Sequence, residues 1–371
     1  MAITPVLNRI LIVVLLVAFL TLMLRFVSTE LPKSLRNTLY RKPAYTLQLA
    51  KSRLIDDPSL GPITSLEAIT GKGRAELIAA GSNGALYLSR SGAVVDRVRF
   101  QVSGPGARAI DSDGDGRFIF FLPGFGSDIA LLREDGSVRW ALAGEGRYNR
   151  YAVGDVNQDM GIEVVLIDWA KGEDGIRVIS EDGTRQWEQT PDGRLFSRIA
   201  CRDIRWQAAC CVGGNLSDIE STDGGSSGRL IPFDTSTFSL IKWPSSDTPV
   251  KILITDRGVL WIDHPRKDSL IRFHVPDEYR DYRHVYGTAV RLQQNKQPYL
   301  AALFIGAKST LVIYDPRGAV VFEEPLNDRC DSILAIPNDR SPEEDLLIGG
   351  SSGVVWRYTL NGIIPTGKLW R

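Results

Sequence analysis

Residues 84–98 read GALYLSRSGAVVDRV, which is an apolar strand, a tight turn and a second strand. The same arrangement recurs along the chain, and its seven copies begin at Gly84, Asp128, Gly175, Gly228, Gly258, Ser309 and Gly353. Their starts are separated by 44, 47, 53, 30, 51 and 44 residues. A period in the forties is typical of a four-stranded propeller blade.

A further apolar strand precedes each hairpin, as in AELIAAG (75–81) and YLAALFIG (299–306). Short continuous apolar runs are typical of strands that are buried on both faces, here between blades. Gly-Ser turns such as GSNG (81–84) and GSSG (350–353) join the two parts. The sequence therefore predicts an all-β, seven-bladed β-propeller over residues 61–371. Because the fourth interval is short, a count of six blades is an alternative, and a count of eight is the other.

One apolar segment precedes the repeats. Residues 10–24 read ILIVVLLVAFLTLML and lie between Arg9 and Arg25. Together with Phe26 and Val27 after it, and with the flanking arginines snorkelling, the segment approaches the roughly 20 residues that a bilayer requires. We expect a short tail (1–9), one uncleaved transmembrane helix (10–27) and a single-pass membrane protein.

A basic stretch follows, which we interpret as a juxtamembrane linker over residues 28–60. Its basic residues are expected near lipid phosphates, either on a short interfacial helix or in a solvated linker; the membrane-surface candidates are Arg25, Lys33, Arg36, Arg41 and Lys42. The excess of basic residues after the helix favours a cytoplasmic propeller. The signal-anchor order and the calcium-type loops favour an extracytoplasmic, periplasmic one, which is the expectation kept here.

Composition excludes several classes of function. The chain has 44 basic and 44 acidic residues, so nothing indicates nucleic acid as a partner. Four cysteines without CxxC spacing indicate neither a disulfide scaffold nor a zinc site. The adjacent Cys210 and Cys211 are interpreted as small strand residues facing opposite ways, with a vicinal disulfide as the alternative.

Two propeller groups resemble these repeats. The hairpins with Asp135-Gly136 before Trp140 and Asp182-Gly183 before Trp187 look like the repeats of quinoprotein-like propellers, including outer-membrane assembly lipoproteins. The stretches DSDGDGRFIFFL (111–122) and GDVNQDMGIEVVL (154–166) resemble FG-GAP/VCBS repeats. The resemblance covers about residues 61–371 and implies a fold more than a function.

The FG-GAP resemblance implies calcium. Carboxylates at alternate positions of a curled loop can point at one hard cation; the candidates are Asp111, Asp113 and Asp115 in one loop and Asp155, Asn157, Asp159 and Glu163 in another. The second loop has Met160 where glycine is usual, and the first lacks an acid at the position of Glu163. Structural calcium is the expectation, and metal-free turn chemistry is the alternative. No other cofactor is expected.

Catalytic patterns are weak. The stretches 224–228 and 349–353 satisfy GxSxG, but each leads into a strand, whereas a hydrolase elbow leads into a helix. His264, His274 and His284 are ten residues apart, which on strands gives no common ligand face. The vicinal cysteines resemble those of quinoprotein dehydrogenases, but no matching cofactor site is evident. The sequence therefore predicts a protein that is not an enzyme.

The segment DEYRDYRHVY (277–286) is the best candidate for a partner surface, because tyrosine and arginine are enriched at interfaces. The candidates are Tyr279, Arg280, Tyr282, Arg283 and Tyr286, and rings packed inward on an inter-blade strand are the alternative. We expect a membrane-anchored scaffold or accessory subunit that binds a protein partner in a larger membrane complex. A carbohydrate- or small-ligand-binding propeller, or an enzyme using the central funnel, is the competing hypothesis.

Overall fold

The computed structural model divides the chain into two units, Met1–Lys42 and Pro43–Arg371. The residues it describes all belong to the second unit; they are 43–69, 75–111, 116–123, 129–143, 150–154, 162–168, 175–189, 198–200, 211–213, 237–241, 250–254, 259–263, 271–274, 284–293 and 297–366. Among these residues no helix is long and apolar enough to cross a membrane. The predicted transmembrane helix (10–27) and the membrane-surface candidates lie outside them.

The described strands form seven antiparallel sheets, six with four strands and one with two. Five sheets are four-stranded meanders, in which consecutive strands of the chain pair with one another. The first two contain β2 (Ile63–Ala68), β3 (Leu77–Gly81), β4 (Gly84–Leu88) and β5 (Val94–Arg99), then β6 (Arg108–Ile110), β7 (Ile119–Leu122), β8 (Ile129–Leu132) and β9 (Val138–Leu142). The other three contain β10 (Arg150–Gly154), β11 (Glu163–Asp168), β12 (Gly175–Ile179) and β13 (Arg185–Gln189), then β16 (Thr237–Ile241), β17 (Val250–Ile254), β18 (Val259–Asp263) and β19 (Ile271–His274), and finally β20 (His284–Val290), β21 (Tyr299–Ile305), β22 (Ser309–Tyr314) and β23 (Val320–Pro325). The two-stranded sheet pairs β14 (Arg198–Ala200) with β15 (Cys211–Gly213).

The remaining sheet, here called the closing sheet, combines strands from both ends of the unit. Its order is β1 (Tyr45–Asp56), β26 (Val354–Pro365), β25 (Glu344–Gly350) and β24 (Cys330–Pro337). A 3₁₀ turn, Pro58–Leu60, leads from β1 into β2. The outermost strand of the closing sheet therefore comes from the start of the unit and the other three from its end.

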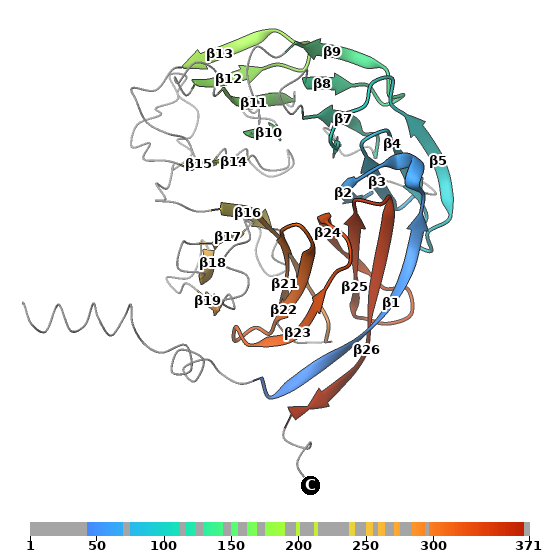
Figure 1. Cartoon of the computed structure of the whole chain (residues 1–371), viewed down its shortest axis with the longest axis vertical. Helices are drawn as coiled ribbons and strands as arrows, with labels where there is room; N and C mark the ends of the chain where they lie inside the picture. The colour runs from blue at the N-terminus through green and yellow to red at the C-terminus, as the bar shows by residue number, and fades with distance from the viewer. Residues whose placement is uncertain are drawn as a thin grey trace, which may run out of the picture. The chain divides into compact units, whose positions relative to one another are not determined.

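The inner strands β2, β10, β14, β16 and β24 lie toward the centre of the ring (Figure 1), and β6 and β20 occupy the same first position in their sheets. Contacts between these inner strands run in the order β6, β2, β24, β20, β16, β14 and β10. The molecule is thus an all-β propeller, as the repeat predicts.

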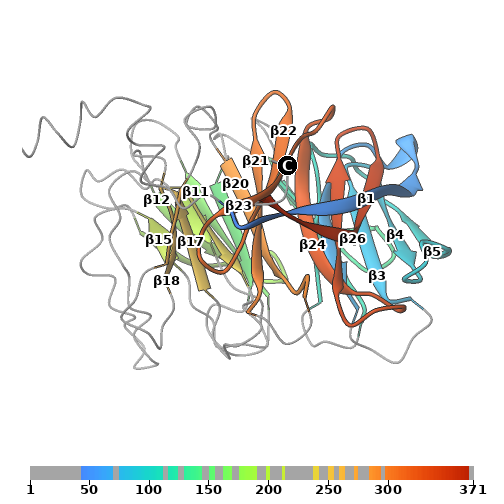
Figure 2. The same cartoon turned by 90° about the horizontal axis from the view of Figure 1, so that it is seen from below.

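The sheets stand next to one another around the ring (Figure 2), and apolar clusters fill the space between neighbouring sheets. In β3, Leu77 and Ala79 pack toward the closing sheet, whereas Ile78 and Ala80 pack toward β6–β9. Alternate residues of a strand point to opposite faces, so a strand buried on both sides must be apolar throughout. This confirms the interpretation of the continuous apolar runs.

The turn between the third and fourth strands repeats in four sheets. Each has a glycine with φ between 81° and 90°, at Gly92, Gly136, Gly183 and Gly318. In each, the glycine N–H donates to the residue three positions earlier, and a β-bulge lies next to the turn. A left-handed residue is what this bulged hairpin requires, which explains the Asp-Gly pairs recognised in the sequence.

The predicted linker over residues 28–60 is wrong for Tyr45–Leu60, which belong to the propeller. Tyr45 pairs with Pro365 and Asp56 pairs with Val354, so β1 covers β26 along its whole length. Two register shifts, at Gln48/Leu49 and Arg53/Ile55, interrupt the alternation of apolar and polar residues. Only Leu47 and Ile55 of this strand are buried, which is why its sequence resembles a solvated linker.

The predicted fourth hairpin, 228–243, is also wrong. Its second half contains β16, which pairs with β17 and so is the inner strand of the following sheet. The short spacing of 30 residues between the fourth and fifth copies follows from this, because part of the fourth copy belongs to the next sheet. Two strands with similar alternation do not reveal from sequence alone which neighbour each will pair with.

Candidate functional site at the inner strands

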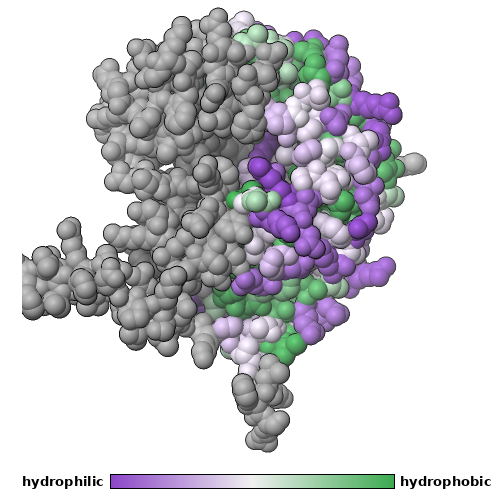
Figure 3. Space-filling model, in the orientation of Figure 1, coloured by the Kyte–Doolittle hydropathy of each residue, from purple (hydrophilic) through white to green (hydrophobic). Residues whose placement is uncertain are grey.

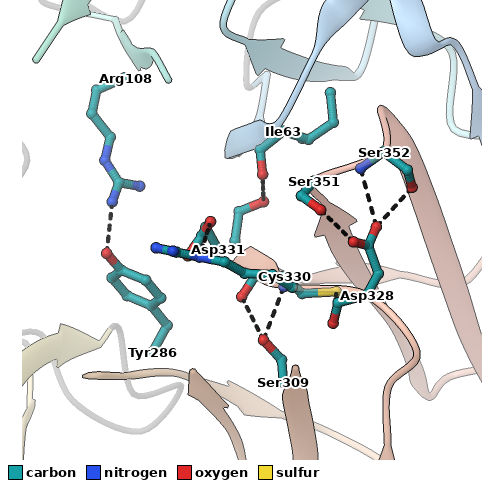
Figure 4. A network of polar contacts seen from close by, with 11 residues as sticks. Ile63, Arg108, Tyr286, Ser309, Asp328, Cys330, Asp331, Ser351 and Ser352 are labelled. Atoms are coloured by element: carbon teal, nitrogen blue, oxygen red, sulfur yellow. Dashed lines mark hydrogen bonds and ion pairs between the residues drawn. The ribbon is translucent and has the colours of Figure 1, made fainter. Parts of the chain in front are cut away.

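Arg108 of β6 and Tyr286 of β20 meet although they are 178 positions apart in the chain. Arg108 Nη2 donates to the Tyr286 hydroxyl at 3.1 Å, and its guanidinium lies 5.4 Å from the centre of the Tyr286 ring. Because β2 and β24 lie between β6 and β20 in the order of inner strands, this contact spans the central side of two other sheets (Figure 4).

Neighbouring backbone groups hold Arg108 in place. Its Nη1 donates to the Thr64 carbonyl at 2.6 Å. Thr64 Oγ1 donates to the Ala107 carbonyl and accepts from the Ala107 N–H, both at 2.8 Å. A Cβ at Gly106 would lie 2.6 Å from Thr64 Oγ1, so a larger residue there would displace this threonine. The arginine is therefore pre-positioned as a fixed cation with an aromatic partner.

A second polar cluster joins the closing sheet to its neighbour. Asp328, in the connection from β23 to β24, accepts hydrogen bonds from Ser351 Oγ, from Ser352 N at 3.1 Å and from Ser352 Oγ at 2.7 Å (Figure 4). Burial raises the pKa of Asp328, but the hydrogen bonds from Ser351 and Ser352 outweigh it and leave the pKa below its ordinary value. The carboxylate is therefore held ionised.

These contacts bear on the GxSxG match at 349–353. Ser351 and Ser352 lie in the turn between β25 and β26, and both hydroxyls are bound to a carboxylate. A nucleophilic serine requires a base that accepts its proton during attack and a strand-to-helix elbow that exposes it. This turn joins two strands rather than a strand and a helix, and the lowered pKa of Asp328 makes its carboxylate a poor proton acceptor.

Cys330, at the start of β24, is buried and free. Its N–H donates to Ser309 Oγ at 2.9 Å, and the same hydroxyl donates to the Cys330 carbonyl at 3.2 Å. Burial, with the carboxylates of Asp328 and Asp331 nearby, raises the pKa of the thiol to about 12. Because the thiolate is the reactive form, Cys330 is expected to be inert while the sheet is folded.

The structure describes two of the seven calcium candidates. Asp111 follows β6 and accepts a hydrogen bond from the Gly116 N–H at 3.2 Å, closing the loop toward β7. Glu163, at the start of β11, is buried. Asp113, Asp115, Asp155, Asn157 and Asp159 lie outside the described residues. Within the described part of the chain no three candidate metal ligands gather.

Of the five partner candidates, the structure describes only Tyr286. The others lie outside the described residues; they are Tyr279, Arg280, Tyr282 and Arg283. Tyr286 is half-buried at the inner strands against Arg108, a position that sequence reasoning left open between a partner surface and inward packing. His274 ends β19 and His284 begins β20, in different sheets, whereas His264 and Cys210 are not described.

Sequence reasoning missed Arg108, Asp328 and Ser309. The repeated GSSG turn was a usable signal for Ser351 and Ser352, but their acceptor lies more than 20 positions away in a loop without a motif. Nothing local marks Arg108. Figure 3 shows hydrophilic residues gathered near the centre and along the outer margin of the described part of one face.

Neither a protein-family model nor a curated protein sequence matches the chain. Among solved structures, it is similar to BamB from Moraxella catarrhalis, at 13% identity and a TM-score of 0.43, over 85% of this chain and 100% of that one. It is also similar to BBS1N in complex with ARL6DN, at 10% identity over 86% of this chain and 93% of that one, with TM-scores of 0.36 and 0.37 in crystals soaked with mercury and lead. These are similarities of fold, and no function is transferred from them.

Proposed function

We propose that this chain is a non-catalytic, membrane-anchored propeller of seven blades that binds a protein partner as a scaffold or accessory subunit of a larger membrane complex. The anchor is the apolar segment 10–27. The propeller is placed on the extracytoplasmic, periplasmic side, and structural calcium in the loops 111–116 and 155–163 is part of the proposal.

The observation that carries the proposal is that reactive side chains are engaged in contacts that join the closing sheet to its neighbour, β20–β23. Ser351 and Ser352 are bound to Asp328, and Cys330 is buried beside Ser309. Side chains that fasten sheets together favour a rigid platform over a site that transfers protons.

One end of the ring is the best candidate for the partner surface. In a four-stranded meander, the connection to the next sheet leaves from the same end as the turn between the second and third strands. The contact of Asp328 with Ser351 and Ser352 marks this end, here called the connection end. The chain from β19 to β20, which contains Tyr282 and Arg283, joins two strands at the same end. Arg329 also lies there, with a side chain 54% exposed.

The propeller offers a matched pair of arginines for testing this. Arg329 at the connection end and Arg317 in the turn at the opposite end have side chains 54% and 53% exposed, and each pairs at 3.1 Å with an aspartate two positions away. Arg329→Ala should cost little stability, because surface ion pairs contribute about 0–1 kcal/mol. Arg317→Ala should cost more, because it removes a partner of Asp315, whose side chain is only 1% exposed, although the Arg317 and Ala319 N–H groups still bind that carboxylate. Only the first should affect a partner at the connection end.

The experiment is purification of tagged full-length protein in mild detergent, with mass spectrometry of proteins that comigrate. We expect a stoichiometric membrane partner, retained by Arg317→Ala and reduced several-fold by Arg329→Ala and by Tyr282→Ala/Arg283→Ala. A clean monomer would overturn the subunit role and direct attention to ligands of the Arg108–Tyr286 site. Equal loss from both single-arginine variants would overturn the choice of the connection end.

A further inference from the structure

One interface of the ring has no chain connection across it. β1 leads directly into β2 at the start of the unit, whereas β24–β26 follow β23 at its end. These two groups of strands meet at an interface here called the seam, which consists of the β1–β26 ladder and the packing of β2–β4 against β24–β26. Only non-covalent contacts therefore hold the ring closed at the seam.

The seam has contacts at its outer side and in its interior. The ladder of β1 with β26 forms the outer side. A cluster of buried apolar side chains from both groups of strands fills the interior. Closer to the centre, Ser332 Oγ of β24 donates to the Ile63 carbonyl of β2 at 3.2 Å. Contacts confined to the outer side would leave the central side free to hinge open, so support from the centre of the ring matters for closure.

The Arg108–Tyr286 contact is placed to give that support. Arg108 lies on β6, in the part of the chain that follows β1, and Tyr286 lies on β20, in the part that precedes β24. The inner strands run β6, β2, β24 and β20, so the seam lies between the two residues. In a ring of seven inner strands no two are more than three steps apart, and β6 and β20 are three steps apart. The contact therefore crosses the ring from one side of the seam to the other (Figure 4).

Each of the two residues is fixed on its own side of the seam. Arg108 Nη1 donates to the Thr64 carbonyl of β2 at 2.6 Å, while Nη2 donates to the Tyr286 hydroxyl at 3.1 Å. Tyr286 packs against the apolar core between β20–β23 and the closing sheet. Because the guanidinium is planar and its donors form a rigid fork, one arginine binds both acceptors at once. Separation of the two sides must therefore break a hydrogen bond and a cation–π contact.

We propose that Arg108 and Tyr286 form an inner brace, which holds the seam closed from the centre of the ring independently of the β1–β26 ladder. The brace is one hydrogen bond and one cation–π contact, whereas the ladder pairs 11 residues of each strand. The ladder therefore decides whether the ring forms, and the brace controls how often the closed ring opens. Contacts of this strength change an opening equilibrium by roughly five- to thirtyfold. The inference does not depend on the proposed anchor or partner.

A thiol placed in the seam can measure its opening. Ala79 and Ala80 are adjacent on β3 and fully buried, but Ala79 faces the closing sheet whereas Ala80 faces β6–β9. Ala79→Cys is therefore the seam reporter, and Ala80→Cys is its matched control. Full-length protein in detergent is treated with a maleimide, and peptide mass spectrometry gives the rate of labelling at each position. When closing is faster than labelling, this rate is proportional to the opening equilibrium constant.

Tyr286→Leu removes the phenol and keeps an apolar side chain for the core. We expect the labelling rate of Ala79→Cys to rise roughly five- to thirtyfold and that of Ala80→Cys to change less than about twofold. Phe322→Leu is the control substitution, because Phe322 packs against the same core from β23, the outer strand of the same sheet as Tyr286. It should leave both labelling rates nearly unchanged.

A double-mutant cycle separates the brace from two unrelated local effects. If Arg108 and Tyr286 act through each other, Arg108→Ala/Tyr286→Leu should label Ala79→Cys no faster than Arg108→Ala alone. Full additivity of the two single effects would overturn the brace. An unchanged rate at Ala79→Cys in the Tyr286→Leu protein would also overturn it. So would equal acceleration at Ala80→Cys or by Phe322→Leu, because either result would indicate general loosening of the core.

Hydrogen–deuterium exchange is a second readout that requires no added cysteine, so it serves even where a reporter variant does not fold. In the Tyr286→Leu protein, the amides that pair β1 with β26 should exchange several-fold faster than in the unmodified protein, while the amides that pair β7 with β8 keep their rates. Unchanged exchange in β1 and β26 would overturn the inference.

Discussion

The closing sheet and the sheet β2–β5 have the same four-stranded architecture but are assembled from different parts of the chain. β2–β5 is a meander within residues 63–99, in which each strand pairs with its sequence neighbour. The closing sheet pairs β1 with β26, and beyond this ladder the hydrogen bond from Thr366 Oγ1 to the Pro43 carbonyl joins residues 323 positions apart. Long-range pairing carries a larger loop-closure entropy cost, which long-range contacts must offset.

At the closing sheet, polar side-chain contacts join residues from distant parts of the chain. In the closing sheet, Arg357 Nε donates to Asp345 Oδ2 at 2.6 Å, and the Asp345 side chain is only 1% exposed. The Tyr45 and Tyr299 hydroxyls lie 2.7 Å apart across two sheets. Lys51 lies 4.6 Å from the centre of the Trp356 ring and 2.7 Å from Glu324. Ring closure thus depends on specific polar contacts as well as on an apolar core.

The largest effect is expected from removing β1. A protein lacking residues 1–56 loses the buried side chains of Leu47 and Ile55 and the whole ladder with β26. We expect loss of at least about 5 kcal/mol of unfolding free energy or no cooperative transition in urea. The control lacks residues 1–42 only, so it keeps β1 and the whole second unit. It should unfold in one cooperative transition. Equal stability of the two truncated proteins would show that β1 does not close the ring.

A smaller effect is expected from Asp345→Ala, which leaves Arg357 partly buried without its carboxylate. Breaking a buried ion pair costs about 3–5 kcal/mol. The control, Glu181→Ala, breaks the half-exposed contact with Arg139 in the meander sheets and should cost less than about 1 kcal/mol. Midpoints of urea denaturation measure both. Similar losses of unfolding free energy for the two variants would contradict the view that the closing sheet depends more than the meanders on a buried ion pair.

The sequence reveals the meanders well because their signals are local. Apolar second strands, glycine turns and the aromatic residue at a hairpin's end all lie within one repeat, and β3, β7 and β21 fall where these patterns predict. β1 was missed because two bulges break its alternation and its basic residues resemble a linker. The fourth hairpin was misassigned because pairing, rather than pattern, places β16 in the next sheet.

The candidate site was much less predictable. Tyr286 was identified as a residue of interest, but its partner Arg108 lies in another sheet, and only the folded ring brings them together. The serines at 351 and 352 were recognised as turn residues without their acceptor, Asp328. Contacts between sheets depend on the closure of the ring, and a single sequence holds no local signal for them.

Asp328→Asn should lower the free energy of unfolding by about 1–3 kcal/mol, because it weakens three hydrogen bonds at the connection end. The pKa of Asp328 lies below the ordinary 3.8 in the folded state. The stabilisation from its carboxylate is therefore present above pH 3.8 and is lost as the pH falls through the lowered value. Urea denaturation of both proteins at pH 7 and pH 3 should show the difference shrinking at pH 3. A pH-independent difference would contradict this role of the charge.

The smallest effect is expected from removing calcium, whose candidate loops belong to the meanders β6–β9 and β10–β13. With calcium five- to tenfold above its dissociation constant, the ion stabilises the folded state by about 1 kcal/mol. Chelation should lower the melting temperature by a few degrees. Asp155→Ala/Asp159→Ala should reduce this sensitivity, and the further changes Asp111→Ala/Asp113→Ala should abolish it. Asp96→Ala, an exposed acid elsewhere, is the control. A melting temperature that chelation leaves unchanged in the unmodified protein would contradict the calcium proposal.

Hydrogen–deuterium exchange of the full-length protein tests ring closure by β1 most directly. If β1 completes the closing sheet, amides of Tyr45–Asp56 that pair with β26 are protected and exchange together with those of β24–β26, as one cooperative unit. Rapid exchange of Tyr45–Asp56 while β24–β26 remain protected would contradict the closure of the propeller by the strand that follows the proposed anchor.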